Sequence, residues 1–290
     1  MDKDPIQIDS SLLRPVLRPR EVDSHKGDYG HLLVVAGCQS MPGAAVLAAG
    51  AALRSGCGLV TLHSTPRALQ GAVDNDPSAM LSEEPGEAFS RVPESLDRYT
   101  AVAVGPGLGR GAQTADALHE LLCAAKKAGI PMAVDADALN LLSEHPAWMA
   151  NLPAGSVLTP HLGELRRLAP FDKGDEEKAA RELSVRSGCV VVMKGFHTKV
   201  FTPDGTCLVN TTGNPGMAKG GSGDVLTGLL GGLLARGYAP ADAAALAVWI
   251  HGFAGDVLTQ ERTAEAYSSK DLIDRLYQGF KQLYDGKDGR

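Results

Sequence analysis

The stretch HLLVVAGCQSMPGAAVLAAGAALRSGCGLVTL, residues 31–62, decides the fold. Its apolar run 31–36 predicts a buried strand, the alanine-rich segment 42–55 predicts a tightly packed helix, and residues 58–62 predict a second strand. Strands that are apolar on both faces and alternate with helices are typical of a parallel sheet covered on both sides. We therefore expect an α/β fold.

The same alternation continues through the chain. We expect strands at 101–104, 131–135, 156–158 and 189–193, a hairpin of strands at 198–202 and 206–209, and helices at 112–128, 137–143, 161–168, 175–187, 223–236, 240–258 and 268–284. The turn Pro203-Asp204-Gly205 indicates the hairpin, which adds an antiparallel edge to the sheet.

Two regions do not follow this alternation. Residues 1–25 are expected to form an extended lead segment, and residues 74–98, which contain three prolines, are expected to be rich in loops. The chain shows neither an internal repeat nor a linker, so we expect one domain over residues 1–290.

Composition narrows the class of protein. The chain of 290 residues is 44% hydrophobic and carries a net charge of -6, which argues against bulk attraction to nucleic acids or membranes. The N-terminus does not resemble a signal peptide, and the apolar stretch 241–250 is short for a membrane span. We expect a cytoplasmic protein. The five cysteines form no metal-binding pattern and are expected to be buried in a reducing compartment: Cys38, Cys57, Cys123, Cys189 and Cys207.

Ligands of parallel sheets bind at the carboxyl ends of the strands. Four predicted strands run there into polar or glycine-rich turns: Gly105-Pro106-Gly107-Leu108-Gly109, Asp135-Ala136-Asp137-Ala138, Thr159-Pro160-His161-Leu162-Gly163-Glu164 and Lys194-Gly195-Phe196-His197-Thr198. Each turn alone is a weak signal, but together they predict a site at this rim.

The strongest motif is the loop TGNPGMAKGGSGD, residues 212–224. Glycines let a phosphate approach the backbone closely, and the helix that follows contributes free amides and the positive end of its dipole. A simple helix cap would need one residue rather than this many glycines. We therefore expect an anion site on the amides of Gly220, Gly221, Ser222, Gly223 and Asp224. Neither this loop nor the 105–109 turn has the spacing of a familiar nucleotide motif.

Asp224 on the first turn of this helix is the candidate catalytic residue. A carboxylate there can accept the proton of a substrate hydroxyl as its oxygen attacks phosphorus, and the helix N-terminus is expected to keep the group ionised. His161 and Glu164 lie three residues apart and can both face the site. Glu164 can order a water bound to Mg²⁺ or serve only as a partner of the helix dipole.

Two interpretations are open for the 194–198 turn and for Lys219. Lys194, Gly195, Phe196, His197 and Thr198 can hold a phosphate or the adenine-ribose edge of a nucleotide, or form a plain turn. Lys219 can contact a phosphate or be a solvated lysine. Four histidines are interpreted as structural: His25, His31, His63 and His251.

With these motifs assembled, the chain from about residue 26 to 284 resembles the ribokinase-like superfamily, and within it the NAD(P)H-hydrate dehydratase family. The phrases that carry the resemblance are Lys26-Gly27-Asp28-Tyr29-Gly30, Gly43-Ala44-Ala45, Asp135-Ala136-Asp137-Ala138-Leu139, the four rim turns and Asn214 to Asp224. The resemblance implies a ribokinase-like three-layer sandwich, with a mostly parallel sheet, helices on both faces and an antiparallel edge hairpin.

The resemblance also implies an activity: dehydration of the S epimer of hydrated NADH or NADPH at the expense of ADP or ATP, with Mg²⁺, through a phosphorylated intermediate. By position, Ala44, Gly107, His161 and Asp224 would contact the hydrated cofactor. Lys194 to Thr198 and Gly223 would contact the nucleotide. A homotetramer and a separate NAD(P)H-hydrate epimerase as functional partner are further expectations, since the chain offers no room for an epimerase domain.

One departure concerns Pro77-Ser78-Ala79-Met80, because relatives often carry a glutamate where this chain has Ser78. Two rival functions stay open. A small-molecule kinase of the hydroxyethylthiazole or pyridoxal type would leave a stable phosphorylated product. A nucleotide sensor would show no turnover.

Overall fold

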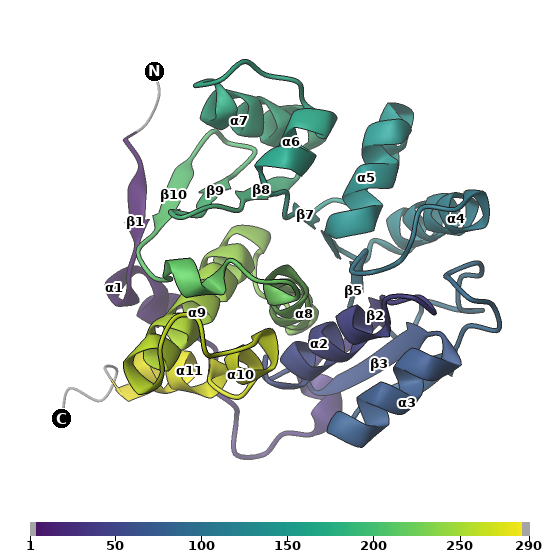
Figure 1. Cartoon of the computed structure of the whole chain (residues 1–290), viewed down its shortest axis with the longest axis horizontal. Coiled ribbons are helices and arrows are strands. Elements are labelled where there is room, and N and C mark those ends of the chain that lie inside the picture. The colour runs from purple at the N-terminus through teal and green to yellow at the C-terminus, as the bar shows by residue number, and fades with distance from the viewer. Residues whose placement is uncertain (1–3, 286–290) are drawn as a thin grey trace.

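A ten-stranded sheet runs through the middle of the molecule in the order β1-β10-β9-β8-β7-β6-β5-β2-β3-β4 (Figure 1). The computed structural model describes residues 4–285. Strand β9 is antiparallel to β8 and β10, whereas the other neighbours are parallel, so the mostly parallel sheet with an antiparallel hairpin is confirmed. The strands are Ile6–Ile8 (β1), His31–Val35 (β2), Leu59–Ser64 (β3), Met80–Glu83 (β4), Ala101–Val104 (β5), Met132–Val134 (β6), Val157–Leu158 (β7), Val190–Met193 (β8), Lys199–Phe201 (β9) and Cys207–Asn210 (β10).

Helices cover both faces of the sheet, which confirms the three-layer sandwich. In β2, Leu32 and Val34 belong to the core that packs against α2, α8 and α9, whereas Leu33 and Val35 belong to the core that packs against α4, α5 and α7. The helices are Ser10–Leu13 (α1), Pro42–Leu53 (α2), Pro66–Asn75 (α3), Ala112–Ala128 (α4), Ala136–Glu144 (α5), Leu162–Leu168 (α6), Glu176–Ser187 (α7), Ser222–Ala235 (α8), Pro240–Glu261 (α9), Ser269–Ile273 (α10) and Leu276–Asp285 (α11).

Helix α8 lies against the sheet and against α2 with almost no space between the backbones. A Cβ atom at Gly228 would lie 1.9 Å from the carbonyl oxygen of Ala48, and one at Gly232 would lie 2.0 Å from Oγ of Ser55. Gly231 faces the sheet, where a Cβ atom would lie 2.7 Å from Cβ of Ala103. The glycines of α8 therefore set how closely the helix packs, and this packing fixes the position of its N-terminus.

The first third of the chain contains regular elements that were not expected. The lead segment is not merely extended, because Ile6–Ile8 pairs with β10 outside the hairpin and the side chain of Asp9 caps α1. Residues 74–98 are rich in loops, as expected, but they also contain the unexpected strand β4, which pairs with β3 at the other edge of the sheet. Helix α3, just before this region, was not expected either.

The C-terminal helices also differ from the prediction. The expected helix 268–284 is two helices, α10 and α11. Helix α9 has 22 residues, so the expectation of a short apolar stretch was wrong: by length and composition α9 could cross a membrane. However, 72% of the most apolar stretch of α9 is buried inside the fold, as in the core helix of a globular protein.

Candidate active site

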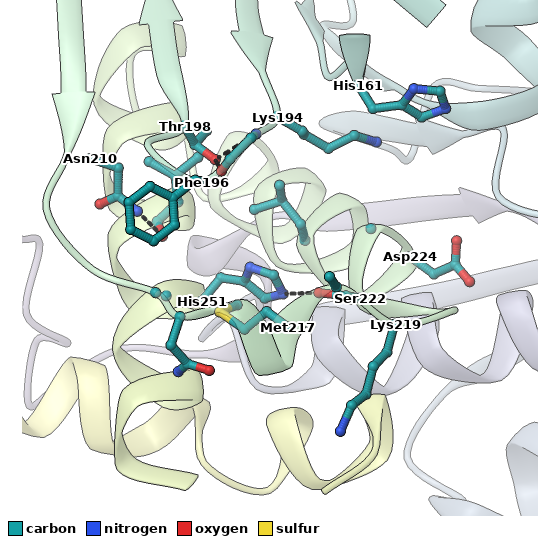
Figure 2. A pocket seen from close by; sticks show the side chains of 18 of the residues that line it. His161, Lys194, Phe196, Thr198, Asn210, Met217, Lys219, Ser222, Asp224 and His251 are labelled. Atoms are coloured by element: carbon teal, nitrogen blue, oxygen red, sulfur yellow. Dashed lines mark hydrogen bonds between the residues drawn. The ribbon is translucent and has the colours of Figure 1, made fainter. Parts of the chain in front are cut away.

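A cavity of about 830 Å³ opens at the carboxyl ends of β6, β7 and β8, where the N-terminus of α8 meets them (Figure 2). Three of the four rim turns and the glycine-rich loop contribute to its wall. Its lining includes Asp135, Ala136, His161, Glu164, Lys194, Phe196, Gly213, Asn214, Met217, Lys219, Ser222, Gly223, Asp224 and His251.

Lys194 is the cation at the centre of this rim. Its Nζ lies 2.6 Å from Oδ1 of Asp135 and 3.8 Å from Oε2 of Glu164. The other oxygen of Asp135 accepts a hydrogen bond of 2.7 Å from Oγ1 of Thr227 on α8. Burial acts to lower the pKa of Lys194, but Asp135 and Glu164 outweigh it and the pKa is raised. Lys194 is thus a fixed positive charge that a phosphate can approach.

Asp224 lies on the first turn of α8 and faces the same cavity (Figure 2). The pKa of its carboxyl group is raised to about 6, mainly by burial and also by Asp135 and Asp137, while Lys194 acts in the opposite direction. The group was expected to be ionised, which holds at neutral pH, but desolvation makes it less acidic than the helix N-terminus alone would. A carboxylate with a pKa near 6 is ionised at neutral pH and is still basic enough to take a proton.

The glycine-rich loop brings the start of α8 to the cavity. Gly221 adopts a φ of 90°, and the first bond of the helical ladder runs from Val225 N–H to the Gly221 carbonyl at 3.1 Å. The amides of Gly223 and Asp224 precede this bond, so they point out of the helix as donors. Gly223 and Asp224 line the cavity, and a bound phosphate there would meet the positive end of the helix dipole.

His161 and Glu164 both line the cavity, and they also form the N-terminal cap of α6. Nδ1 of His161 accepts hydrogen bonds from the amides of Gly163 and Glu164, at 2.9 and 3.3 Å, so the ring hydrogen is on Nε2 when the ring is neutral. Oε2 of Glu164 accepts from the His161 amide at 2.8 Å. Burial raises the pKa of Glu164 and lowers that of His161.

The structure does not bring every expected residue to the cavity. Ala44 and Gly107 meet each other, since a Cβ atom at Gly107 would lie 2.7 Å from Cβ of Ala44, but neither lines the cavity. His197 and Gly221 do not line the cavity either. The ring centroid of His197 lies 4.2 Å from that of Phe196, and Gly221 lies against the side chain of Leu47. The other expected nucleotide contacts line the wall: Lys194, Gly195, Phe196, Thr198, Gly220, Ser222 and Gly223.

The contacts of Lys219 match neither of the two interpretations, a phosphate contact or a solvated lysine. Its Nζ donates to the carbonyl oxygens of Ala264 and Glu265 at 2.8 and 3.2 Å and also to that of Tyr267. In Figure 2 the side chain runs away from Ser222 and Asp224. Lys219 therefore ties the glycine-rich loop to the segment before α10.

His251 was interpreted as structural, yet it forms part of the cavity wall. Its Nε2 lies 3.4 Å from Oγ of Ser222 (Figure 2). Burial lowers the pKa of its ring to about 4, so the ring is neutral at physiological pH. Sequence reasoning also passed over Ala136, whose φ of 49° is rare for a residue with a side chain and places strain between Asp135 and Asp137.

The cavity has carboxylates but no ready-made metal cage. Across residues 4–285, no group of three or more His, Cys, Asp and Glu side chains is arranged to hold a metal ion. Asp135 is engaged by Lys194 and Thr227, and Glu164 by the start of α6.

Comparison with known proteins identifies close relatives of this architecture. Residues 32–278 match the family described as NAD(P)H-hydrate dehydratase. A bifunctional NAD(P)H-hydrate repair enzyme from Moorella thermoacetica is 39% identical over 276 residues, covering 91% of this chain and 51% of the relative. The chain therefore spans about half the length of the bifunctional relatives it matches. An ADP-dependent (S)-NAD(P)H-hydrate dehydratase from Bacillus subtilis is 33% identical, covering 93% of this chain and 96% of the relative.

Solved structures agree with the sequence comparison. The crystal structure of the ADP/ATP-dependent NAD(P)H-hydrate dehydratase from Bacillus subtilis, co-crystallised with ATP and Mg²⁺, has a TM-score of 0.83 and 31% identity, covering 97% of this chain and 99% of that chain. A hydroxyethylthiazole kinase from Pyrococcus horikoshii has a TM-score of 0.60 at 17% identity, over 92% of each chain, and shares the fold alone.

Proposed function

Because the chain belongs to the NAD(P)H-hydrate dehydratase family, we propose that it restores NADH and NADPH from their hydrated forms, using ADP as the phosphoryl donor. The substrate is the S epimer, in which water has added to the nicotinamide ring. The ring hydroxyl takes the terminal phosphoryl group of ADP, which releases AMP. Phosphate then leaves the ring, a neighbouring ring carbon loses a proton, and the reduced nicotinamide is regenerated.

The observation that carries this proposal is that Asp224, Lys194 and the first amides of α8 meet in one cavity. Asp224 takes the hydroxyl proton as the ring oxygen attacks phosphorus. Lys194 and the amides of Gly223 and Asp224 stabilise the negative charge on the transferring phosphoryl group. Phosphate is a far better leaving group than hydroxide, and the ring nitrogen supplies the electron pair that expels it.

The two substrates would then enter from opposite sides of Asp224. The nucleotide lies along residues 194–198 and 220–223, most of which line the cavity wall. The hydrated nicotinamide lies toward His161, Ala44 and Gly107. Asp137 connects this second side to Asp224, because it accepts a hydrogen bond of 2.9 Å from the Gly109 amide and raises the pKa of Asp224.

Mg²⁺ would arrive with the nucleotide. The carboxylates of Asp135 and Glu164 at the rim are already hydrogen bonded, which fits an ion held mainly by phosphate oxygens and water, with Glu164 reached through a water molecule. When bound, the ion would neutralise part of the negative charge of the phosphates. A homotetramer, a cytoplasmic location and cooperation with a separate epimerase complete the proposal.

The test is to incubate the purified protein with hydrated NADH and Mg²⁺, together with ADP, ATP or no nucleotide. The proposal predicts recovery of NADH absorbance at 340 nm with stoichiometric AMP and phosphate when ADP is present. A stable phosphorylated product would instead identify a small-molecule kinase. Nucleotide binding without turnover would identify a sensor.

A further inference from the structure

The glycine-rich loop is shaped by one face of α9 rather than by its own sequence alone. Gly252 and Gly255 leave room for it: a Cβ atom at Gly252 would lie 2.3 Å from Oγ1 of Thr212, and one at Gly255 would lie 2.5 Å from Sδ of Met217. Any larger side chain at either glycine would push the loop away. The loop therefore lies directly on the helix.

Asp256, on the same face, makes the polar contacts. Its Oδ2 accepts a hydrogen bond of 2.9 Å from the Gly213 amide, and its Oδ1 accepts one of 3.0 Å from Nδ2 of Asn214. Gly213 has a φ of 105°, one of several conformations open to glycine, and its hydrogen bond to Asp256 favours this one. One carboxylate thus fixes both the backbone and the side chain at the start of the loop.

Asn214 in turn binds a later residue of the loop and a residue outside it. Its Oδ1 accepts from the Gly216 amide and from the hydroxyl of Tyr267, both at 3.0 Å. The orientation of the side-chain amide is therefore determined: its oxygen faces two donors, and its nitrogen faces the carboxylate of Asp256. Gly213 and Asn214 line the cavity, whereas Asp256 does not.

We propose that Asp256 is a positioning residue that sets nucleotide affinity by holding the glycine-rich loop in its binding conformation without touching the ligand. This inference rests on the proposed function, because it assumes that the nucleotide occupies the cavity wall that the loop forms. With Asn at position 214, a carboxylate is required at position 256, because its two oxygens accept from the Gly213 backbone amide and the Asn214 side-chain amide at the same time.

The geometry also predicts which kinetic constant changes. Asp224 is held by α8, which is locked against α2 through Gly228 and the Ala48 carbonyl, independently of Asp256. Loosening the start of the loop should therefore raise the KM for the nucleotide and leave the pH dependence of kcat in place.

The sharpest experiment is a reciprocal exchange. In Asp256→Asn, a side-chain NH₂ faces that of Asn214, and the loss of a hydrogen bond to a charged group is expected to raise the Kd and KM for ADP roughly tenfold or more. In Asn214→Asp, two carboxylates face each other, with a similar result. Combining both substitutions restores every donor and acceptor, because the new amide accepts from Gly213 and donates to the new carboxylate. ADP affinity should return to within about threefold of the parent.

Asp242→Asn, on the first turn of the same helix, is the matched charge control and should leave ADP affinity unchanged. Isothermal titration with ADP, steady-state kinetics at saturating hydrated NADH, and thermal unfolding are measured on all four variants. If Asp256→Asn lowers the melting temperature but leaves the KM and Kd for ADP unchanged, or if the exchange is no better than the single variants, the inference is overturned. If the parent protein itself neither binds nor uses ADP, the proposed function fails instead.

Discussion

Replacing Asp224 with Asn should inactivate the protein and stabilise it at the same time. The amide has nearly the shape of the carboxylate but cannot take a proton from the substrate. Removing a general base typically costs about 10²- to 10⁴-fold in rate. We therefore expect kcat of Asp224→Asn to fall by that factor while ADP still binds.

The gain in stability follows from the buried charge. The pKa of Asp224 is raised from 3.8 to about 6, mainly by burial, so the folded state favours the neutral form. A pKa shift of one unit corresponds to about 1.4 kcal/mol, so at pH 7 and above this shift lowers the free energy of unfolding by about 3 kcal/mol. Relaxation of the protein and solvent around the charge reduces this cost to about 1–3 kcal/mol. Below pH 3.8 the group is neutral in both the folded and unfolded states, and the cost disappears.

The assay is thermal unfolding of the parent and of Asp224→Asn from pH 4 to pH 8. The melting temperature of the variant should exceed that of the parent by several degrees at pH 7–8, and the difference should shrink toward zero at pH 4. A variant that is less stable at pH 8, or a difference independent of pH, would show that the carboxylate is not a strained buried base. Near-normal turnover would refute its catalytic role.

Asp137→Asn keeps an acceptor for the Gly109 amide but removes a charge that raises the pKa of Asp224, so the acid limb of kcat/KM should move to lower pH; an unmoved limb would contradict the coupling. A Cβ atom at Gly223 would lie 3.4 Å from Oδ2 of Asp135 and from Nζ of Lys194, which is ordinary contact, so Gly223→Ala should retain ADP binding. The larger side chain of Gly223→Val should weaken ADP binding about tenfold or more in a titration. Equal ADP affinities of the two variants would argue against phosphate binding on this turn. Chelation with EDTA should abolish turnover without lowering the melting temperature, since Mg²⁺ is expected to come with the nucleotide; a large fall in melting temperature would reveal a structural ion.

Much of the fold could be predicted because the buried strands are short, continuous apolar runs separated by helical stretches. The boundaries of α4 were correct, and those of β2 and α2 were within one or two residues. β1 and β4 were missed because strands of three or four residues at the edge of a sheet show half-exposed, mixed patterns. Their pairing depends on partners far away in the sequence, β10 and β3.

The candidate site was predictable where a motif marks a strand end, as at Lys194 and at the loop before Asp224. It was not predictable for His251 and Asp256, because both lie inside a long helix whose composition indicates only core packing. Their significance comes from the loop that folds back onto α9. The raised pKa of Asp224 was missed for a similar reason, since burial and the proximity of Asp135 are properties of the tertiary structure.

The glycines of α8 limit how this protein could be engineered. Exchanging glycine for alanine within a helix is a common route to a more heat-resistant protein, worth about 1 kcal/mol per site. That route is closed at Gly228, Gly231 and Gly232, where each added methyl group would overlap atoms of Ala48, Ala103 or Ser55. A mutant library aimed at thermostability should leave these three positions unchanged. A substitution at any of them would require a compensating substitution at the residue that it overlaps.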